Sequence, residues 1–418
     1  MTLQMSPRRS FVMAFCLAAP LFAAPATTSW EASYDKGMAA FDAGRYAQAV
    51  SPLVASLEQA RKMPQPDVRV VKSAHTLALV YQLQGNLAQA EPLFLEAKSG
   101  VEAMGIEGLP LLGYVLDGLG ELRLDQGRPR EAEPLLRKAV ELCRANPVGT
   151  NLCTVNAMRH LGVLLTLQGA ATEAESLLQN VIGILRENPS LPRVQLAGCL
   201  GNLAVVYMKD GRYELAEPLL NESLELSKRE GDAHSVLADT LLDLGELYRL
   251  EHNVPRAEPL LKRALHIYEA TNDPQQAAAL SELGRVALDE GKYAIAKQYL
   301  RQSLAIYQHL VGSAHLLEAR VKAGLAEAFL GERNYSEAKS LIQDALATER
   351  SSSVSDDSAF ARLLMTAGRI EEQGHCTSLA AEYYSEAVHI YRKSLRSSHP
   401  ERTQAERKYA RFVKSLPK

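Results

Sequence analysis

The sequence predicts an all-α fold in which about nine helix pairs stack into a solenoid and a final helix covers the last pair. Two observations lead to this prediction: one short phrase recurs at a near-constant interval, and the composition favours helices. Aromatic residues make up 6% of the 418-residue chain although 47% is apolar, so Ala and Leu dominate the apolar fraction. Sheets favour β-branched and aromatic residues, and helices favour Ala and Leu.

The recurring phrase has a glycine five residues before a central alanine. It is seen at 85–93 (GNLAQAEPL), 127–135 (GRPREAEPL) and 211–219 (GRYELAEPL). The central alanines are Ala49, Ala90, Ala132, Ala174, Ala216, Ala257, Ala296, Ala338 and Ala380, at intervals of 39 to 42 residues. Nine units at a near-constant period indicate a solenoid rather than the two or three domains that the length alone favours.

Each unit is predicted to contain two helices. In the sixth unit, the helical i, i+3, i+4, i+7 spacing appears before the phrase in Leu241, Leu244, Gly245 and Tyr248, and again within it in Ala257, Leu260, Leu261, Ala264 and Leu265. Small residues such as Gly245 and Ala257 let the two helix axes approach closely. Four units carry a proline that we expect early in the second helix, where a missing N–H costs little: Pro92, Pro134, Pro218 and Pro259.

The glycine between the two helices, such as Gly211, is expected to adopt a positive φ at the end of the first helix. His252 and Arg333 stand at this position in two units, and the ninth unit has one extra residue between Gly374 and Ala380. Distorted turns are therefore expected in these three units.

The pattern resembles the tetratricopeptide repeat, in the 42-residue form found in kinesin light chains. The resemblance covers Ser29 to Leu395 and is strongest at 200–207 (LGNLAVVY), 211–213 (GRY) and 216–220 (AEPLL). It implies a right-handed solenoid over residues 27–396. It also implies a non-enzymatic scaffold without a cofactor, in which the first helices line a concave groove that holds a protein or peptide partner.

Placing this register on the chain gives a set of candidate groove residues on the first helices. These are Tyr114, Asp117, Glu121, Arg159, Asn202, Asp239, Glu246, Arg249, Arg285 and Arg320. Kinesin light chains hold a peptide backbone with asparagines, and only Asn202 is similar here. Each charged residue alone is compatible with an ion pair inside the solenoid; the set as a whole favours a binding groove.

Residues 1–26 have the layout of a secretory signal. Arg8 and Arg9 precede the apolar run 11–24, and Ala24-Pro25-Ala26 forms a small-x-small site after which cleavage would leave a chain beginning at residue 27. The paired arginines also resemble a twin-arginine export signal, so both the general secretory route and the twin-arginine route stay open. The protein is thus expected in the periplasm or outside the cell, with no membrane-spanning segment in the mature chain.

Cys143 and Cys153 flank one inter-unit loop. In an oxidising compartment this spacing allows a disulfide; the alternative is that both are small apolar packing residues. The oligomeric state is not predicted.

Residues 397–418 are expected to form a capping helix, because a terminal repeat leaves an apolar face to cover. Tyr409, Ala410 and Val413 supply the expected apolar side, among many charged residues.

The sequence carries no pattern typical of an active site, a phosphate-binding loop or a metal site. The formal charge of −3 also argues against a nucleic-acid partner, which usually requires a basic excess. One alternative function is a hydrolase of an extended substrate such as a glycan. It would use the acidic cluster Asp239, Asp243 and Glu246 on one helix face.

Overall fold

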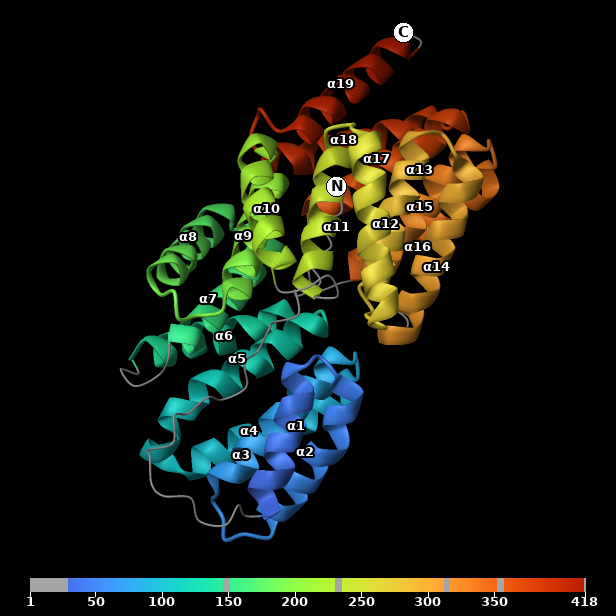
Figure 1. Cartoon of the computed structure of the whole chain (residues 1–418). Coiled ribbons are helices and arrows are strands. Elements are labelled where there is room, and N and C mark those ends of the chain that lie inside the picture. The colour runs from blue at the N-terminus through green and yellow to red at the C-terminus, as the bar shows by residue number, and fades with distance from the viewer. Residues whose placement is uncertain (1–28, 146–150, 230–234, 312–315, 352–356, 417–418) are drawn as a thin grey trace. The chain divides into compact units, whose positions relative to one another are not determined.

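The computed structural model describes residues 29–145, 151–229, 235–311, 316–351 and 357–416. These residues form nineteen α-helices and one short 3₁₀ helix, with no strand among them. Within each of the two units described below, the two helices of a repeat pack side by side, coloured from blue to red along the chain in Figure 1. Examples are α5 (Leu109–Asp125) with α6 (Pro129–Ala145), and α17 (Asp357–Gln373) with α18 (Thr377–Ser394). The predicted all-α repeat architecture is confirmed. The predicted signal at 1–26 lies outside the described residues.

Each repeat contributes one odd-numbered and one even-numbered helix. The first helices of the nine repeats are α1 (Ser29–Asp42), α3 (Val68–Leu83), α5 (Leu109–Asp125), α7 (Asn151–Leu167), α9 (Arg193–Lys209), α11 (Ser235–Leu250), α13 (Gln276–Asp289), α15 (Leu316–Gly331) and α17 (Asp357–Gln373). The second helices are α2 (Tyr46–Arg61), α4 (Leu87–Ala103), α6 (Pro129–Ala145), α8 (Ala171–Glu187), α10 (Tyr213–Lys228), α12 (Val254–Ala270), α14 (Tyr293–Val311), α16 (Tyr335–Ser351) and α18 (Thr377–Ser394). The last helix is α19 (Pro400–Ser415), and the 3₁₀ helix η1 (Gly105–Gly108) precedes α5.

The array divides into two compact units. Among the described residues, the amino-terminal unit holds 29–164 and 183–191, and the carboxy-terminal unit holds 165–182 and 192–416. The core of the amino-terminal unit runs through α1 to α5. In the carboxy-terminal unit, three buried clusters follow one another from α11 to α19.

The central alanines form the most regular part of the core. All nine are completely buried, and each is followed four residues later by a buried larger side chain, such as Leu53, Leu220 or Tyr384. The predicted close approach of the two helices also occurs. A Cβ atom built on Gly245 would lie 2.5 Å from Leu261, and Gly284 stands in the same relation to Leu300 at 2.7 Å. Glycine in the first helix therefore makes room for the leucine of the second helix.

The turn between the two helices has one conformation in every repeat. The residue five positions before each central alanine has a positive φ, and in six repeats it is glycine. His252, Arg333 and His375 adopt the same left-handed conformation, with φ of 59°, 62° and 63°. The expected distortion at His252 and Arg333 is therefore wrong. The ninth repeat has no extra residue, because His375 rather than Gly374 occupies the turn position.

The four prolines lie early in the second helices, as expected, but not among the first residues, whose N–H groups have no partner within the helix. Each is the sixth residue of its helix, beyond the first turn, because the helix begins only two residues after the left-handed position. All four are exposed, so the carbonyl that loses its partner faces water and the cost of the lost hydrogen bond is reduced.

Helix α19 follows the last repeat but packs with a different face from the one predicted. Ala405 and Phe412 are buried, and the ring of Phe412 lies 5.2 Å from that of Tyr384 in edge geometry. Ala410 and Val413 are exposed, and Tyr409 is half-buried. The helix is rotated relative to the predicted register, because the large aromatic side chain of Phe412 gains more from burial than Val413 would.

Candidate functional site

The carboxy-terminal unit contains a cavity of about 1100 Å³. Most of its lining comes from the first helices α11, α13, α15 and α17 and from α19. Small-molecule sites usually measure roughly 300–1,000 Å³, so this cavity is large enough for a ligand with several side chains. The stacking of the repeats brings together residues that are far apart in the sequence.

The lining of the cavity is rich in cationic side chains, and we call it the basic cavity. Eight lining residues are basic: Arg249, Arg285, Arg320, Arg362, Arg369, Arg407, Lys408 and Arg411. Three are acidic: Asp289, Glu327 and Glu401. Apolar contact surface comes from Leu250, Ala323, Leu363 and Met365. The sequence-predicted groove residues Arg249, Arg285 and Arg320 all belong to this lining.

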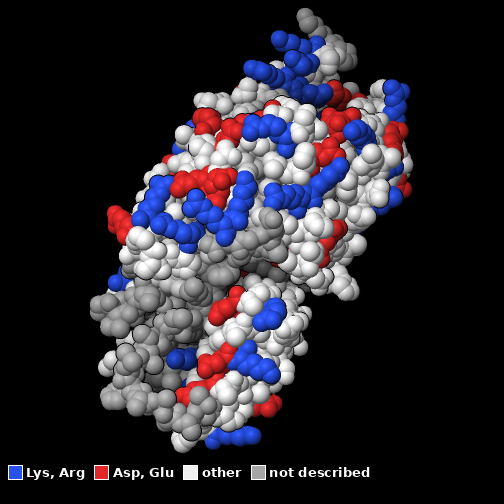
Figure 2. All heavy atoms as spheres, in the orientation of Figure 1, with Lys and Arg blue, Asp and Glu red and all other residues white. Residues whose placement is uncertain are grey.

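Elsewhere on the carboxy-terminal unit, charges of opposite sign are neighbours. Figure 2 shows many Lys and Arg side chains on the visible face, with Asp and Glu side chains next to several of them. On the second helices such pairs are solvent-exposed, as for Lys262 and Glu258 at 2.7 Å. Exposed pairs of this kind contribute about 0–1 kcal/mol each to stability.

A buried ion-pair network forms the α11–α13 part of the basic cavity. Arg249 Nε donates to Glu282 Oε2 at 2.8 Å, and Asp289 lies 3.6 Å from the same guanidinium. Arg285 Nε lies 3.5 Å from the other carboxylate oxygen of Glu282. Glu282 is 2% exposed and Arg249 is 8% exposed. Arg249 is therefore a structural ion-pair partner as well as a lining residue, since an isolated buried charge is costly.

The electrostatics of this network are dominated by burial. Burial and the positive charges of Arg249 and Arg362 lower the pKa of Arg285. The carboxylate of Glu282 acts in the opposite direction but does not outweigh them. Burial and the nearby Glu282 raise the pKa of Glu246 to about 8. Arg285 thus lies where positive charge is disfavoured and a further anion would be stabilised.

Helix α19 is fixed to the repeats at its first turn. Its N-cap is His399, whose Nδ1 accepts a hydrogen bond from the backbone N–H of Glu401 at 3.2 Å. The carboxylate of Glu401 accepts from Arg362 of α17 at 3.1 Å. These contacts position the residues of α19 that line the basic cavity.

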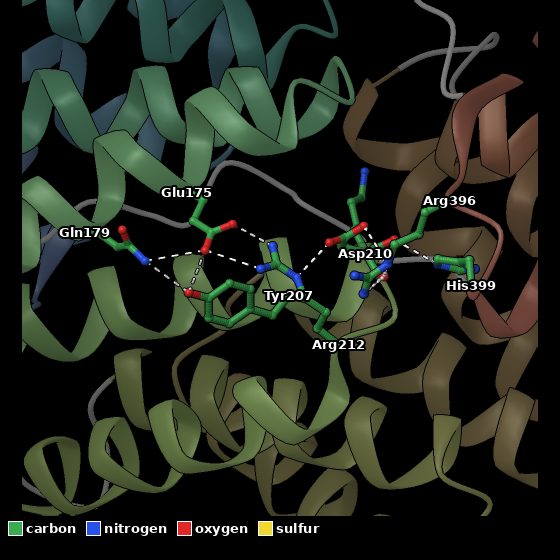
Figure 3. Close-up of polar contacts among 8 residues, drawn as sticks. Glu175, Gln179, Tyr207, Asp210, Arg212, Arg396 and His399 are labelled. Atoms are coloured by element: carbon green, nitrogen blue, oxygen red, sulfur yellow. Dashed lines mark hydrogen bonds and ion pairs between the residues drawn. The ribbon is translucent and has the colours of Figure 1, made fainter.

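A second anchor joins the segment before α19 to the turn between α9 and α10 (Figure 3). Arg396 donates to the backbone carbonyl of Asp210 through Nε at 3.0 Å and through Nη2 at 2.7 Å. His399 Nε2 lies 3.0 Å from the carbonyl oxygen of Lys209, and because Nδ1 accepts, Nε2 is the nitrogen that carries the proton. Burial lowers the pKa of His399, in agreement with a neutral ring. We call the set Lys209, Asp210, Arg396 and His399 the closing contact.

The turn that receives the closing contact is itself rigidly held. Figure 3 shows the Arg212 guanidinium between the carboxylates of Glu175 and Asp210. Its Nη2 lies 2.6 Å from Glu175 and its Nε lies 2.7 Å from Asp210. The hydroxyl of Tyr207 donates a hydrogen bond to Glu175 at 3.0 Å, and the guanidinium of Arg212 lies 4.4 Å from the centre of the Tyr207 ring. The hydrogen bond from Arg212 lowers the pKa of Glu175. Helix α8, the end of α9 and the turn before α10 thus share one polar network.

The predicted groove residues of the amino-terminal unit gather in a buried cluster. His160 Nδ1 lies 2.7 Å from Asp117, and its Nε2 lies 3.4 Å from Glu121. Arg159 also contacts the imidazole. All four side chains are less than a tenth exposed, and Tyr114 nearby in α5 is half-buried. His160 is not among the residues that the sequence predicts for this site. Its place beside Arg159, one repeat after Asp117 and Glu121, was the signal that could have identified it.

Three further predicted groove residues lie outside the lining of the basic cavity. Asp239 accepts from the hydroxyl of Tyr268 at 2.6 Å. Glu246 is buried in α11. Asn202 is completely buried in α9, and neither atom of its amide has a hydrogen-bond partner among the described residues.

Cys143 and Cys153 are joined in a disulfide, with Cα atoms 5.5 Å apart. This separation lies in the usual range of roughly 4.4–6.8 Å. The bond connects the end of α6 to the first turn of α7.

Within the described ranges no group of three metal-ligating side chains comes together. None of the helices described is both long and apolar enough to cross a membrane.

Comparison with protein-family models matches the chain to the tetratricopeptide repeat. One repeat model covers residues 112–187, 195–270 and 275–351, and a second covers 70–102. No curated protein gives a significant match.

Solved structures of similar fold cover most of the chain at low identity. A Rap protein complexed with competence and sporulation factor matches with a TM-score of 0.67 and 14% identity, over 88% of this chain and 99% of that one. The apo form of RapI matches with a TM-score of 0.54 and 16% identity, over 87% and 98% of the two chains. A putative kinesin light chain from Podosopora anserina with nearly identical repeats is 22% identical over 48% and 97%, with a TM-score of 0.37. At these identities the likeness to the two Rap structures shows the fold alone.

Proposed function

Because the chain belongs to the tetratricopeptide repeat family, we propose that it is a protein-binding scaffold. The basic cavity of the carboxy-terminal unit holds a polypeptide segment of its partner. The observation that carries this proposal is the cavity itself, about 1100 Å³ in volume and lined by four successive first helices and α19. Deep concave sites with apolar and polar lining are where proteins bind ligands.

Two further points support a binding role. The Rap protein of similar fold is complexed with competence and sporulation factor, so an array of this kind can hold a ligand. Tetratricopeptide repeats typically act as interaction scaffolds rather than as enzymes, and we propose that this chain does the same without a cofactor. The alternative glycan hydrolase finds no support, because Asp239 of its proposed acidic cluster is engaged by Tyr268.

We assign the predicted groove residues to two roles. Arg249, Arg285 and Arg320 belong to the proposed binding site. The cluster of Asp117, Glu121 and Arg159 around His160 is assigned to the stability of the amino-terminal unit.

The test is to capture a partner from a cell-envelope extract by cross-linking and to measure its affinity for the purified full chain. Reversing an exposed lining charge, Arg407→Glu, is expected to weaken binding. Lys262→Glu on the exposed side of α12 is the matched control and should leave the affinity unchanged. The proposal fails if both variants bind the partner as the parent does, or if the control weakens binding equally. Arg249→Glu is unsuitable, because it would place a carboxylate against buried Glu282.

We also propose that the protein is exported and loses residues 1–26. Intact mass and N-terminal sequencing of the protein from the cells that produce it are expected to give a chain beginning at Thr27. A full-length cytosolic product would contradict export and would leave the binding proposal intact.

A further inference from the structure

We infer that the basic cavity selects an acidic polypeptide segment, one that carries several Asp or Glu side chains, and that α19 supplies part of the binding surface. This inference rests on the proposed function and names the chemistry of the partner. It concerns the carboxy-terminal unit alone.

The charge balance of the lining is the first argument. Eight basic residues face three acidic ones. Two carboxylates outside the lining, Glu282 and Glu372, pair with Arg249 and Lys408, and the excess of positive charge persists when they are included. The whole chain has a formal charge of −3, so the excess is local to the cavity. A cleft lined with one sign of charge attracts ligands of the opposite sign.

Unused hydrogen-bond donors are the second argument. Nη2 of Arg249 is buried and has no hydrogen-bond partner among the described residues. Nε of Arg285 is also buried, and although it lies 3.5 Å from Glu282 it forms no hydrogen bond there. Buried polar atoms are nearly always hydrogen-bonded, and each exception requires an explanation. A carboxylate of the ligand supplies the missing acceptor. Its negative charge also offsets the burial that disfavours the guanidinium of Arg285.

The distribution of the arginines is the third argument. Arg249, Arg285, Arg320 and Arg362 come from four successive first helices, α11, α13, α15 and α17. Arg407 and Arg411 are four residues apart in α19, so they lie on one side of that helix. Such a spread requires several anionic groups along one chain rather than a single small anion.

The lining favours an acidic polypeptide over a nucleic acid. Asp289, Glu327 and Glu401 would repel a phosphate at every nucleotide, whereas they can accept hydrogen bonds from the backbone N–H groups of a peptide. Leu363 and Met365 offer apolar contacts to aliphatic side chains.

The experiment measures fluorescence anisotropy of the purified full chain with three labelled decapeptides of matched length, which are Glu-rich, Lys-rich and Ser/Gly-rich. A single-stranded oligonucleotide of the same net charge as the Glu-rich peptide is the fourth probe. The two reversals Arg407→Glu and Arg411→Glu are combined in one variant. Lys393→Glu, exposed on α18 and outside the lining, is the control.

The Glu-rich peptide is expected to bind best, to lose affinity as the salt concentration rises, and to bind the double variant on the order of tenfold more weakly. The control variant should bind it as the parent does. Preference for the Lys-rich or Ser/Gly-rich peptide, stronger binding of the oligonucleotide, or no binding of any probe overturns the inference. A captured cellular partner that binds at the cavity through a basic or neutral segment also overturns it, but leaves the proposed scaffold function standing.

Discussion

Leu261 occupies the space that a side chain at Gly245 would need: a Cβ atom built on Gly245 would lie 2.5 Å from Leu261 Cδ2. The same relation, sixteen residues apart, recurs at Gly37 and Leu53, and at Gly120 and Leu136. In these repeats the contact between the two helices is therefore set by one glycine and one leucine.

Replacing this glycine should destabilise the repeat. Gly245→Ala is expected to cost about 1–3 kcal/mol, because the new methyl group forces Leu261 and its neighbours to move. Native-state hydrogen exchange of the α11 and α12 amides measures the loss. Gly198→Ala in α9 is the matched control. No atom lies within 4 Å of its Cβ position, so alanine should be neutral or stabilise by about 0.5–1 kcal/mol. Equal destabilisation by both variants would show that the Gly245–Leu261 contact is not the cause.

Glycine substitutions at the left-handed turn positions that lack glycine should stabilise the protein. Arg333→Gly and His375→Gly are each expected to stabilise the carboxy-terminal unit by about 0.5–1 kcal/mol, because glycine adopts a positive φ without steric cost. Urea titration followed by circular dichroism at 222 nm measures the change. Arg333→Ala keeps the strain and should give no gain; if it stabilises as much as glycine, the side chain rather than the turn conformation is responsible.

The amino-terminal unit should lose stability at alkaline pH. Burial and Arg159 disfavour protonation of His160, but Asp117 and Glu121 outweigh them and raise its pKa from 6.5 to about 9. The stabilisation is fully present below pH 6.5 and is lost as the pH rises through 9, with a total of up to about 3 kcal/mol. The loss of stability is measured by amide hydrogen exchange in α5 and α7, after correction for the intrinsic pH dependence of exchange. His160→Gln should remove the alkaline loss, and His266→Gln, exposed on α12, should not. An unchanged profile in His160→Gln would contradict the assignment.

The closing contact should be detectable at both of its ends. Arg396→Ala is expected to speed amide exchange in α19 and also in residues 209–213 of the α9–α10 turn, because two hydrogen bonds to the Asp210 carbonyl are lost. Arg392→Ala removes an exposed pair with Glu406 inside the same region and should affect α19 alone. If the turn exchanges at the parent rate in Arg396→Ala, the closing contact does not hold the two segments together in solution.

The repeat architecture could be predicted because it rests on local signals. The positions of Ala49 to Ala380, the turn position and the Gly245 contact all follow from a sequence spacing that recurs along the chain. Glycine usually marks this turn, so the sequence predicts the turn of the ninth repeat at Gly374. The structure shows that the marker is the backbone conformation, which His375 also adopts.

The candidate site was predictable only in part. The register predicted Arg249, Arg285 and Arg320 as groove residues, but the pairing of Arg249 and Arg285 with buried Glu282 depends on how neighbouring repeats pack. Helix α19 was expected only to cap the array. Its contribution to the basic cavity depends on the closing contact, which joins residues 186 positions apart and leaves no periodic trace in the sequence.

A linear repeat array loses its terminal units first, since each of these has a neighbour on one side only. The closing contact gives α19 a second neighbour within the carboxy-terminal unit, so fraying from this end must break two interfaces at once. In a nearest-neighbour description the free energy of the last helix includes a coupling to the fifth repeat as well as to the ninth. Unfolding of the carboxy-terminal unit should then be more cooperative than that of an open array with the same number of helices. Truncation before residue 396 should therefore lower the stability of the fifth repeat, four repeats before the ninth.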